Sequence, residues 1–129
     1  LMDVNGLKHV NDKSGHGAGD LLLCEAANSI KDAFPEEQDA WYRLGGDEFV
    51  VLMTETELDN EKCRKRLSKA AEKWKNYERG PISISCGSKT AKNVKIAREA
   101  VFHLIHEADQ MMYKNKILYY QKKLNKRNT

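Results

Sequence analysis

The stretch "WYRLGGDEFVVLM", residues 41–53, limits the possible folds more than any other part of the chain. Two runs rich in aromatic and β-branched residues, Ala40–Leu44 and Phe49–Met53, flank Gly-Gly-Asp-Glu, an arrangement typical of a β-hairpin. Gly45 and Gly46 can adopt positive φ angles, so the backbone can turn tightly there. The second run is apolar throughout, which predicts a central strand covered on both faces. The chain must therefore contain a sheet to which this hairpin belongs.

Three further segments repeat apolar residues at helical spacing, and one alternates like a strand. "ISISCGS", from Ile82 onward, predicts a half-buried strand whose serines face the more polar side. The expected order is strand, helix, hairpin, helix, strand, helix. This order predicts a single α/β (α+β) domain with a mostly antiparallel central sheet and flanking helices. The three expected helices are Gly19–Phe34, Leu58–Tyr77 and Ile96–Tyr113.

Composition supports a globular domain and argues against a nucleic-acid binder. The 129 residues fit one domain with one core, and 40% hydrophobic with 32% charged residues is ordinary for such a domain. The net charge of +3 depends on the C-terminal "KKLNKRNT", which holds four Lys and Arg residues, so the rest is close to neutral. A nucleic-acid binder usually has a basic face. We read residues 121–129 as a solvated basic tail.

Cysteine usage and hydropathy indicate a cytoplasmic setting for this part of the protein. Cys24, Cys63 and Cys86 are widely spaced and form no CxxC pair, so neither a disulfide framework nor a zinc site is expected. No apolar run reaches the roughly 20 residues that span a bilayer. Because "LMDVNG" resembles the end of a buried strand, we expect a truncated fragment whose parent carries an upstream sensory, dimerisation or membrane-anchoring region.

The hairpin acids, Asp47 and Glu48, are the first candidates for chemistry. Successive strand residues point to opposite faces, so the two cannot share one role unless the turn twists them together. A polar turn is the commoner explanation for such a pair. Asp3, however, follows an apolar pair, and beside the hairpin its carboxylate would meet that of Asp47. Two partly buried carboxylates favour a divalent cation, and magnesium so bound keeps positions open for phosphate oxygens.

Other polar residues acquire a role only if that site exists. The segment after Asp3 could offer backbone N–H groups and a cation to phosphates; these residues are Gly6, Leu7 and Lys8. Residues 11–20 otherwise form an ordinary loop that caps the next helix, with Asp20 as its N-terminal acid. Lys116 is by default a surface lysine.

Four blocks of the sequence together resemble a known family. "DVNGLKHVNDKSGHGAGD", "RLGGDEF", "ISISCG" and "ADQMMYKNK" occur in this order, and the chain thereby resembles the GGDEF domain of diguanylate cyclases over residues 1–120. The resemblance implies a fold of the nucleotide-cyclase or polymerase-palm type. It also implies condensation of two GTP molecules into cyclic di-GMP with release of pyrophosphate. Magnesium, with manganese as an alternative, would be the cofactor and a second GGDEF domain the partner.

The same resemblance assigns a role to each matching residue. Asp3, the Val4 carbonyl and Asp47 would bind the metal; Asp47 would also help to deprotonate the attacking 3′-hydroxyl, assisted by Glu48. Asn11 and Asp20 would read guanine, since a carboxylate can accept hydrogen bonds from guanine N1–H and N2–H₂. The phosphate contacts would come from Gly6, Leu7, Lys8 and Lys116.

Three departures from the family pattern keep an alternative open. Tyr120 stands where many members have a phosphate-binding arginine, and either Tyr120 or a tail lysine could replace it. Glu36 and Asp39 occupy the positions of the R-x-x-D product-inhibition site, so no such site is expected, because an acid in place of the arginine should repel cyclic di-GMP. The family's leading helix is missing. The alternative is a catalytically silent signalling module that binds GTP or a partner domain.

Overall fold

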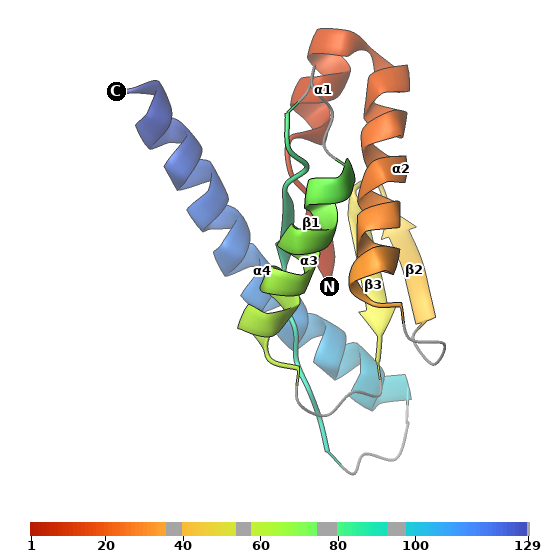
Figure 1. Cartoon of the computed structure of the whole chain (residues 1–129). Coiled ribbons are helices and arrows are strands. Elements are labelled where there is room, and N and C mark those ends of the chain that lie inside the picture. Colours follow the sequence, from red (N-terminus) through yellow and green to blue (C-terminus); the bar gives the residue numbers. More distant parts are fainter. Residues whose placement is uncertain (36–39, 54–57, 75–79, 93–97, 129) are drawn as a thin grey trace.

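The computed structural model describes residues 1–35, 40–53, 58–74, 80–92 and 98–128. Helices pack on one antiparallel sheet (Figure 1), as the α/β (α+β) prediction requires. In chain order the elements are β1 (Met2–Val4), α1 (Leu7–Ser14), α2 (His16–Ala33), β2 (Ala40–Gly45), β3 (Glu48–Leu52), α3 (Asn60–Ala71) with a 3₁₀ turn (Glu72–Trp74), β4 (Ile84–Cys86) and α4 (Arg98–Arg127).

The sheet places β1 between the hairpin and β4. The strand order is β2-β3-β1-β4, and every pairing is antiparallel. Asp3 pairs with Glu48 on one side and with Ser85 on the other. The predicted sheet and hairpin are confirmed, and the short first strand is the element on which the two halves of the sheet meet.

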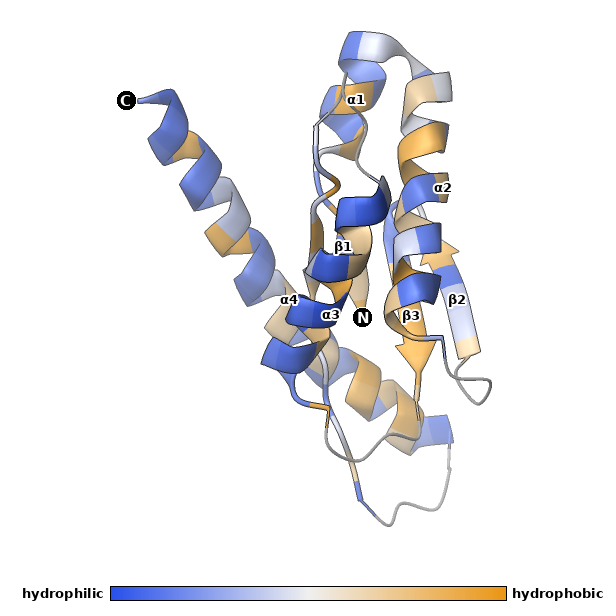
Figure 2. Cartoon of the chain, viewed as in Figure 1, coloured by the Kyte–Doolittle hydropathy of each residue, from blue (hydrophilic) through white to orange (hydrophobic). Residues whose placement is uncertain are grey.

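Alternation along β1 separates the core from the polar face. Met2 and Val4 are buried in the apolar core, which also takes in Ala26 and Ile30 of α2. Asp3 points to the other face and contacts Lys116 of α4. In Figure 1, α2 and α3 lie side by side while α4 passes behind α3 and its last turns extend away from the body. Figure 2 shows the matching pattern, with β3 apolar and the exposed side of α3 hydrophilic.

α1 spans residues 7–14 and α2 begins at residue 16, although the sequence predicted a loop over residues 11–20. Leu7 and Val10, three residues apart, lie on one face of α1 and pack against the core. This packing stabilises the helix although the segment is rich in residues that favour turns. Gly15 has φ 83° and separates α1 from α2, so α2 begins at His16 rather than at Gly19. The loop prediction was wrong because it considered local propensity without this packing.

Other boundaries also moved. α3 begins at Asn60, where the Asp59 side chain accepts a hydrogen bond from the backbone N–H of Lys62 at 2.8 Å; Tyr77, its expected end, lies outside the described residues. Leu52 is 42% exposed, so β3 is not covered on both faces at its end. β3 continues past Phe49, the last of its residues that pairs with β1.

The last two elements differ from expectation in burial and in length. Ser85 shares a face of the sheet with Asp3, its partner in β1, as the alternation predicted, but it is fully buried there and its hydroxyl donates to the Asn5 side chain at 3.0 Å. α4 continues to Arg127, well beyond Tyr113, because no glycine or proline follows to end it. It passes without a break through residue 120, so the boundary between domain and tail stays a prediction. No helix in the described ranges is both long and apolar enough to cross a bilayer.

Candidate active site

The hairpin turn is held in place on both sides. Gly45 and Gly46 have φ angles of 143° and 51°, in the range that favours glycine. The Arg43 guanidinium donates two hydrogen bonds to the Gly46 carbonyl, at 3.0 and 2.7 Å. The backbone N–H of Val4 donates to the Asp47 carbonyl at 2.9 Å. Asp47 is thus fixed to β1, next to Asp3.

Three charged side chains meet at this point, and we call Asp3, Asp47 and Lys116 the acidic corner. Lys116 Nζ donates to Asp3 Oδ2 at 2.8 Å, with the Asp3 side chain 5% exposed and that of Lys116 27% exposed. Burial raises the pKa of Asp3; the Lys116 hydrogen bond opposes this shift, and the Asp47 carboxylate adds to it. Burial alone would lower the pKa of Lys116, but the hydrogen bond and charge of Asp3, with Asp47 and Tyr120, raise it.

The donor set of the acidic corner suits magnesium. Asp3 Oδ1 is buried and has no hydrogen-bond partner. Such an atom is costly unless a ligand satisfies it. No group of three or more His, Cys, Asp or Glu suited to a metal occurs among the described residues. Two carboxylates and the Val4 carbonyl would leave positions free for phosphate oxygens, which is how magnesium is usually held with a nucleotide.

Glu48 leaves the sheet from the same face as Asp3, because the two are directly opposite in the β1–β3 pair. The glutamate is half-buried. The register of β1 and β3 therefore places Glu48 on the face that carries the acidic corner.

The first turn of α1 carries backbone donors that an anion could use. Gly6 has φ 79°, and the Val10 N–H donates to its carbonyl at 3.1 Å as the helix begins. The N–H groups of Leu7 and Lys8 precede this bond and have no partner within the helix. The Lys8 side chain is exposed. Backbone donors and a cation therefore lie just after β1, on the connection that leaves the acidic corner.

A second polar feature lies where α1 and α2 meet; we call Asn11, Gly19 and Asp20 the α1–α2 notch. Asn11 Oδ1 is buried without a hydrogen-bond partner. A Cβ on Gly19 would lie 1.8 Å from that oxygen, so the absence of a side chain there makes room for Asn11. Asp20 is exposed beside it. An unpaired amide oxygen next to an exposed carboxylate can accept hydrogen bonds from a base.

Comparison with known proteins identifies the family of this chain. The family model described as "Diguanylate cyclase, GGDEF domain" matches residues 1–119. The chain belongs to the GGDEF domain family. It is 35% identical over 119 residues to the diguanylate cyclase DgcP of Pseudomonas aeruginosa, covering 90% of this chain and 17% of that protein.

Two further relatives extend the comparison. MucR of Pseudomonas aeruginosa, a bifunctional diguanylate cyclase and cyclic di-GMP phosphodiesterase, is 48% identical over 73 residues, covering 53% of this GGDEF domain and 10% of MucR. The crystal structure of the diguanylate cyclase SiaD with its activator SiaC, from the same species, superposes with a TM-score of 0.70 at 26% identity. That match covers 89% of this chain and 44% of SiaD. The GGDEF domain thus spans a small part of its curated relatives.

Several residues that support the site were missed by the sequence reasoning. The Asn5 side chain donates to Ser83 at 3.1 Å and to Ser85 at 2.9 Å, which ties the end of β1 to the β4 segment. Asn115 accepts from the backbone N–H of Cys86 at 3.0 Å. The position of Asn5, two residues after Asp3 and so on the same face, was a usable signal. Nothing in the sequence pointed to Asn115, because its partner is a backbone group 29 residues away.

The departures from the family pattern have unequal support. Tyr120 is 41% exposed and lies near enough to Lys116 to affect the pKa of that lysine. Its ring meets that of Tyr119 edge-on, with centroids 5.0 Å apart. Tyr120 therefore lies beside the phosphate-binding candidate Lys116. Glu36 and Asp39 are outside the described residues, so the expected loss of product inhibition stays a prediction.

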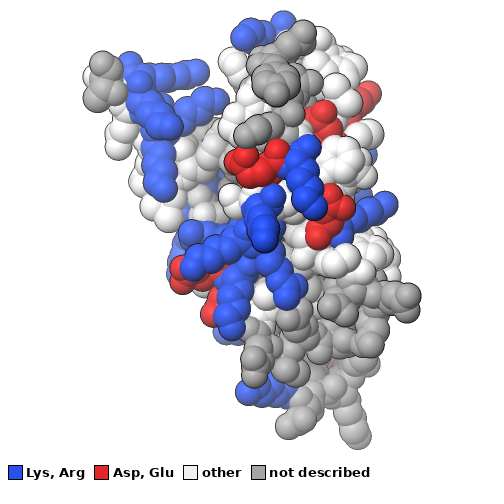
Figure 3. All heavy atoms as spheres, in the orientation of Figure 1, with Lys and Arg blue, Asp and Glu red and all other residues white. Residues whose placement is uncertain are grey.

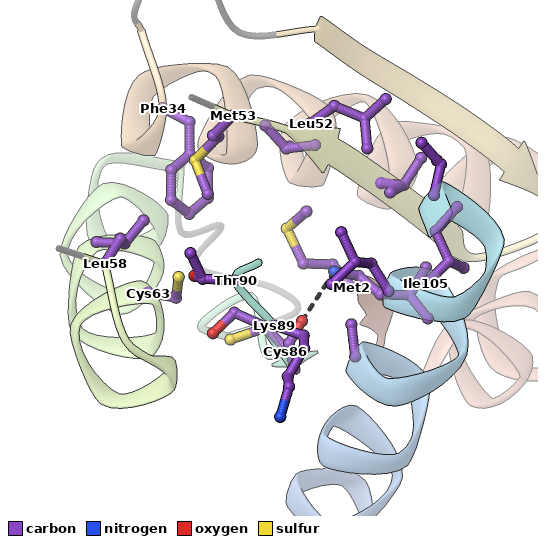
Figure 4. A pocket seen from close by; sticks show the side chains of 18 of the residues that line it. Met2, Phe34, Leu52, Met53, Leu58, Cys63, Cys86, Lys89, Thr90 and Ile105 are labelled. Carbon is purple, nitrogen blue, oxygen red and sulfur yellow. Dashed lines mark hydrogen bonds between the residues drawn. The ribbon is translucent and has the colours of Figure 1, made fainter. Parts of the chain in front are cut away.

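An apolar cavity of about 390 Å³ lies away from the acidic corner. Figure 4 shows Phe34, Met53, Leu58 and Ile105 around it. None of Asp3, Asp47 and Lys116 lines it. Cys63 and Cys86 also line this cavity as free thiols; burial raises the pKa of both, that of Cys86 to about 11, so they are neutral. Lys89 is the one charged side chain among the described lining residues, so the cavity has no carboxylate that could bind a metal ion for phosphate chemistry.

Proposed function

We propose that the protein carrying this GGDEF domain is a magnesium-dependent diguanylate cyclase. The observation that carries the proposal is the orphaned, buried Asp3 Oδ1 beside Asp47 and Lys116. A buried carboxylate oxygen without a donor is what a cation site requires. The nucleotide is inferred from the family and from the polar groups of the α1–α2 notch.

The residues would divide the work as follows. Asp3, the Val4 carbonyl and Asp47 would hold magnesium, which supplies a positive charge opposite the triphosphate. Lys116 would exchange its ion pair with Asp3 for a phosphate oxygen, and Lys8 with the first N–H groups of α1 would hold the terminal phosphates. Asn11 and Asp20 would accept hydrogen bonds from guanine. Each group orients the nucleotide or neutralises charge, which is how most phosphoryl-transfer enzymes act.

The chemistry requires two domains. The 3′-oxygen of one GTP attacks the α-phosphorus of the other, a new P–O bond forms, and the α–β phosphoanhydride bond breaks to release pyrophosphate. Asp47, assisted by Glu48, would accept the hydroxyl proton. The reciprocal attack closes the ring and releases a second pyrophosphate. Because each domain would bind one GTP, a second copy must face the first.

The test is turnover by the full-length, dimeric protein. GTP and magnesium should give cyclic di-GMP by mass spectrometry, and Asp47→Ala should abolish the product while the protein stays folded and dimeric. Absence of product from a verified wild-type dimer would refute the proposal.

A silent signalling module is the second candidate, and Tyr120 is the observation that favours it. A phenol is a weaker phosphate ligand than a guanidinium, which binds in a bidentate fashion and always carries charge. This candidate predicts that isothermal titration detects GTP binding while no cyclic di-GMP forms. Product formation by the wild-type protein would exclude it.

A further inference from the structure

One side chain of α4 binds a backbone group on the outer edge of β4. β4 is the last strand of the sheet. The backbone of Ser83 and Gly87 faces β1, since Asn5 N–H donates to the Ser83 carbonyl and Gly87 N–H to the Leu1 carbonyl, each at 2.9 Å. The N–H of Cys86, between them, therefore points outward. Asn115 Oδ1 accepts it at 3.0 Å, so a free edge donor is used to hold the helix.

The backbone of α4 also packs closely on Gly87, at the end of β4. A Cβ built on Gly87 would lie 2.1 Å from the Ala108 carbonyl oxygen and 2.2 Å from the Met112 nitrogen. Ala108 and Met112 are the buried residues of α4. The helix thus lies directly on the strand end, and the Asn115 bond comes one turn later, immediately before Lys116.

This turn of α4 makes two contacts with the sheet, the Asn115 hydrogen bond to Cys86 and the Lys116 ion pair with Asp3, and a bound nucleotide should affect only the second. In the proposed function, on which this inference rests, Asp3 binds magnesium and Lys116 binds phosphate, so their 2.8 Å ion pair must open. The bond between Asn115 and the Cys86 amide involves neither residue and can persist. We propose that Asn115 is a positioning residue, which anchors α4 to the edge of β4 and so keeps Lys116 at the acidic corner when its ion pair with Asp3 opens.

Matched variants of this chain separate anchoring from general packing. Asn115→Leu keeps the approximate size but removes the acceptor, whereas Asn115→Asp keeps an acceptor in the same place. Gln121→Leu changes an exposed residue of α4 and controls for added apolar surface. Circular dichroism and urea unfolding establish that each variant folds, and Asn115→Ala replaces the leucine variant if that one does not.

The first measurement does not depend on nucleotide chemistry. The rate of Lys116 acetylation by acetic anhydride is followed by mass spectrometry, with the exposed Lys69 as internal reference. Loss of one hydrogen bond should raise the Lys116 rate severalfold, up to roughly tenfold, in Asn115→Leu. Asn115→Asp and Gln121→Leu should match the wild type. Equal rates in the leucine and aspartate variants would overturn the proposal.

The second measurement tests whether Asn115 acts through Lys116. In the full-length protein, Asn115→Leu should lower kcat/KM for GTP by roughly tenfold, but by less than about twofold when Lys116→Ala is already present. Equal losses in both backgrounds would show a merely structural role and contradict the inference. If no cyclic di-GMP forms at all, the proposed function fails, while the acetylation rates still decide the role of Asn115.

Discussion

The acidic corner draws its side chains from residues 3, 47 and 116, whereas the α1–α2 notch uses two helices joined at Gly15. A glycine makes room at the notch, and another lies where β4 meets α4, the helix that carries Lys116. The missing side chain of Gly19 leaves space for the end of the Asn11 side chain, while Gly87 lies against the backbone of α4. A side-chain end can rotate aside, but a helix backbone cannot. Position 19 should therefore accept a larger residue, whereas position 87, which lies under the helix that carries Lys116, should not.

The largest expected effect is on turnover, at the acidic corner. Asp3→Asn removes a charged ligand and should lower kcat/KM for GTP by about 100-fold or more in the full-length dimer. Asp12→Asn changes an exposed acid of α1 and serves as the control. Steady-state rates of cyclic di-GMP formation give the answer. Activity within a few-fold of wild type would mean that Asp3 is not a metal ligand.

The next largest expected effect is on the free energy of unfolding, when alanine replaces Gly87 or Gly19. Gly87→Ala should lower the free energy of unfolding by about 1–3 kcal/mol, because the new methyl group meets fixed backbone. Gly19→Ala should stay within about 1 kcal/mol of wild type, since Asn11 can rotate away and alanine favours the helix. Urea unfolding of this chain measures both. Equal destabilisation by the two substitutions would contradict the contrast between the notch and the contact of β4 with α4.

A smaller effect is expected on base discrimination at the notch. Asp20→Asn replaces one acceptor with a donor facing guanine, so the preference for GTP over ITP, which lacks the 2-amino group, should fall by about tenfold. Competition binding with the two nucleotides provides the ratio. An unchanged ratio would remove Asp20 from guanine recognition without affecting the assignment of the acidic corner.

The smallest effect concerns pH. Burial raises the pKa of Asp3 above its ordinary value of 3.8, so the folded state binds this proton more tightly than the unfolded state. Stability contributed by protonated Asp3 is full below pH 3.8 and declines as pH rises through the folded pKa. In urea unfolding without magnesium, wild type should lose stability relative to Asp3→Asn as the pH rises above 3.8. A constant difference would contradict the raised pKa.

The amino-acid sequence by itself determined the hairpin and the sheet type, because the β-runs around Gly45 and Gly46 and the helical spacing are local properties of the chain. The four sequence blocks pointed to the family. The sequence also pointed to Asp3 and Asp47, since both lie at strand ends. Only the tertiary structure decided that Leu7–Ser14 is a helix, because its two apolar residues gain stability from a core built by distant segments. The tertiary structure alone also revealed the ion pair of Asp3 with Lys116 and the hydrogen bond of Asn115 to β4. These contacts join residues 113 and 29 positions apart, and no local pattern records how closely α4 packs on Gly87.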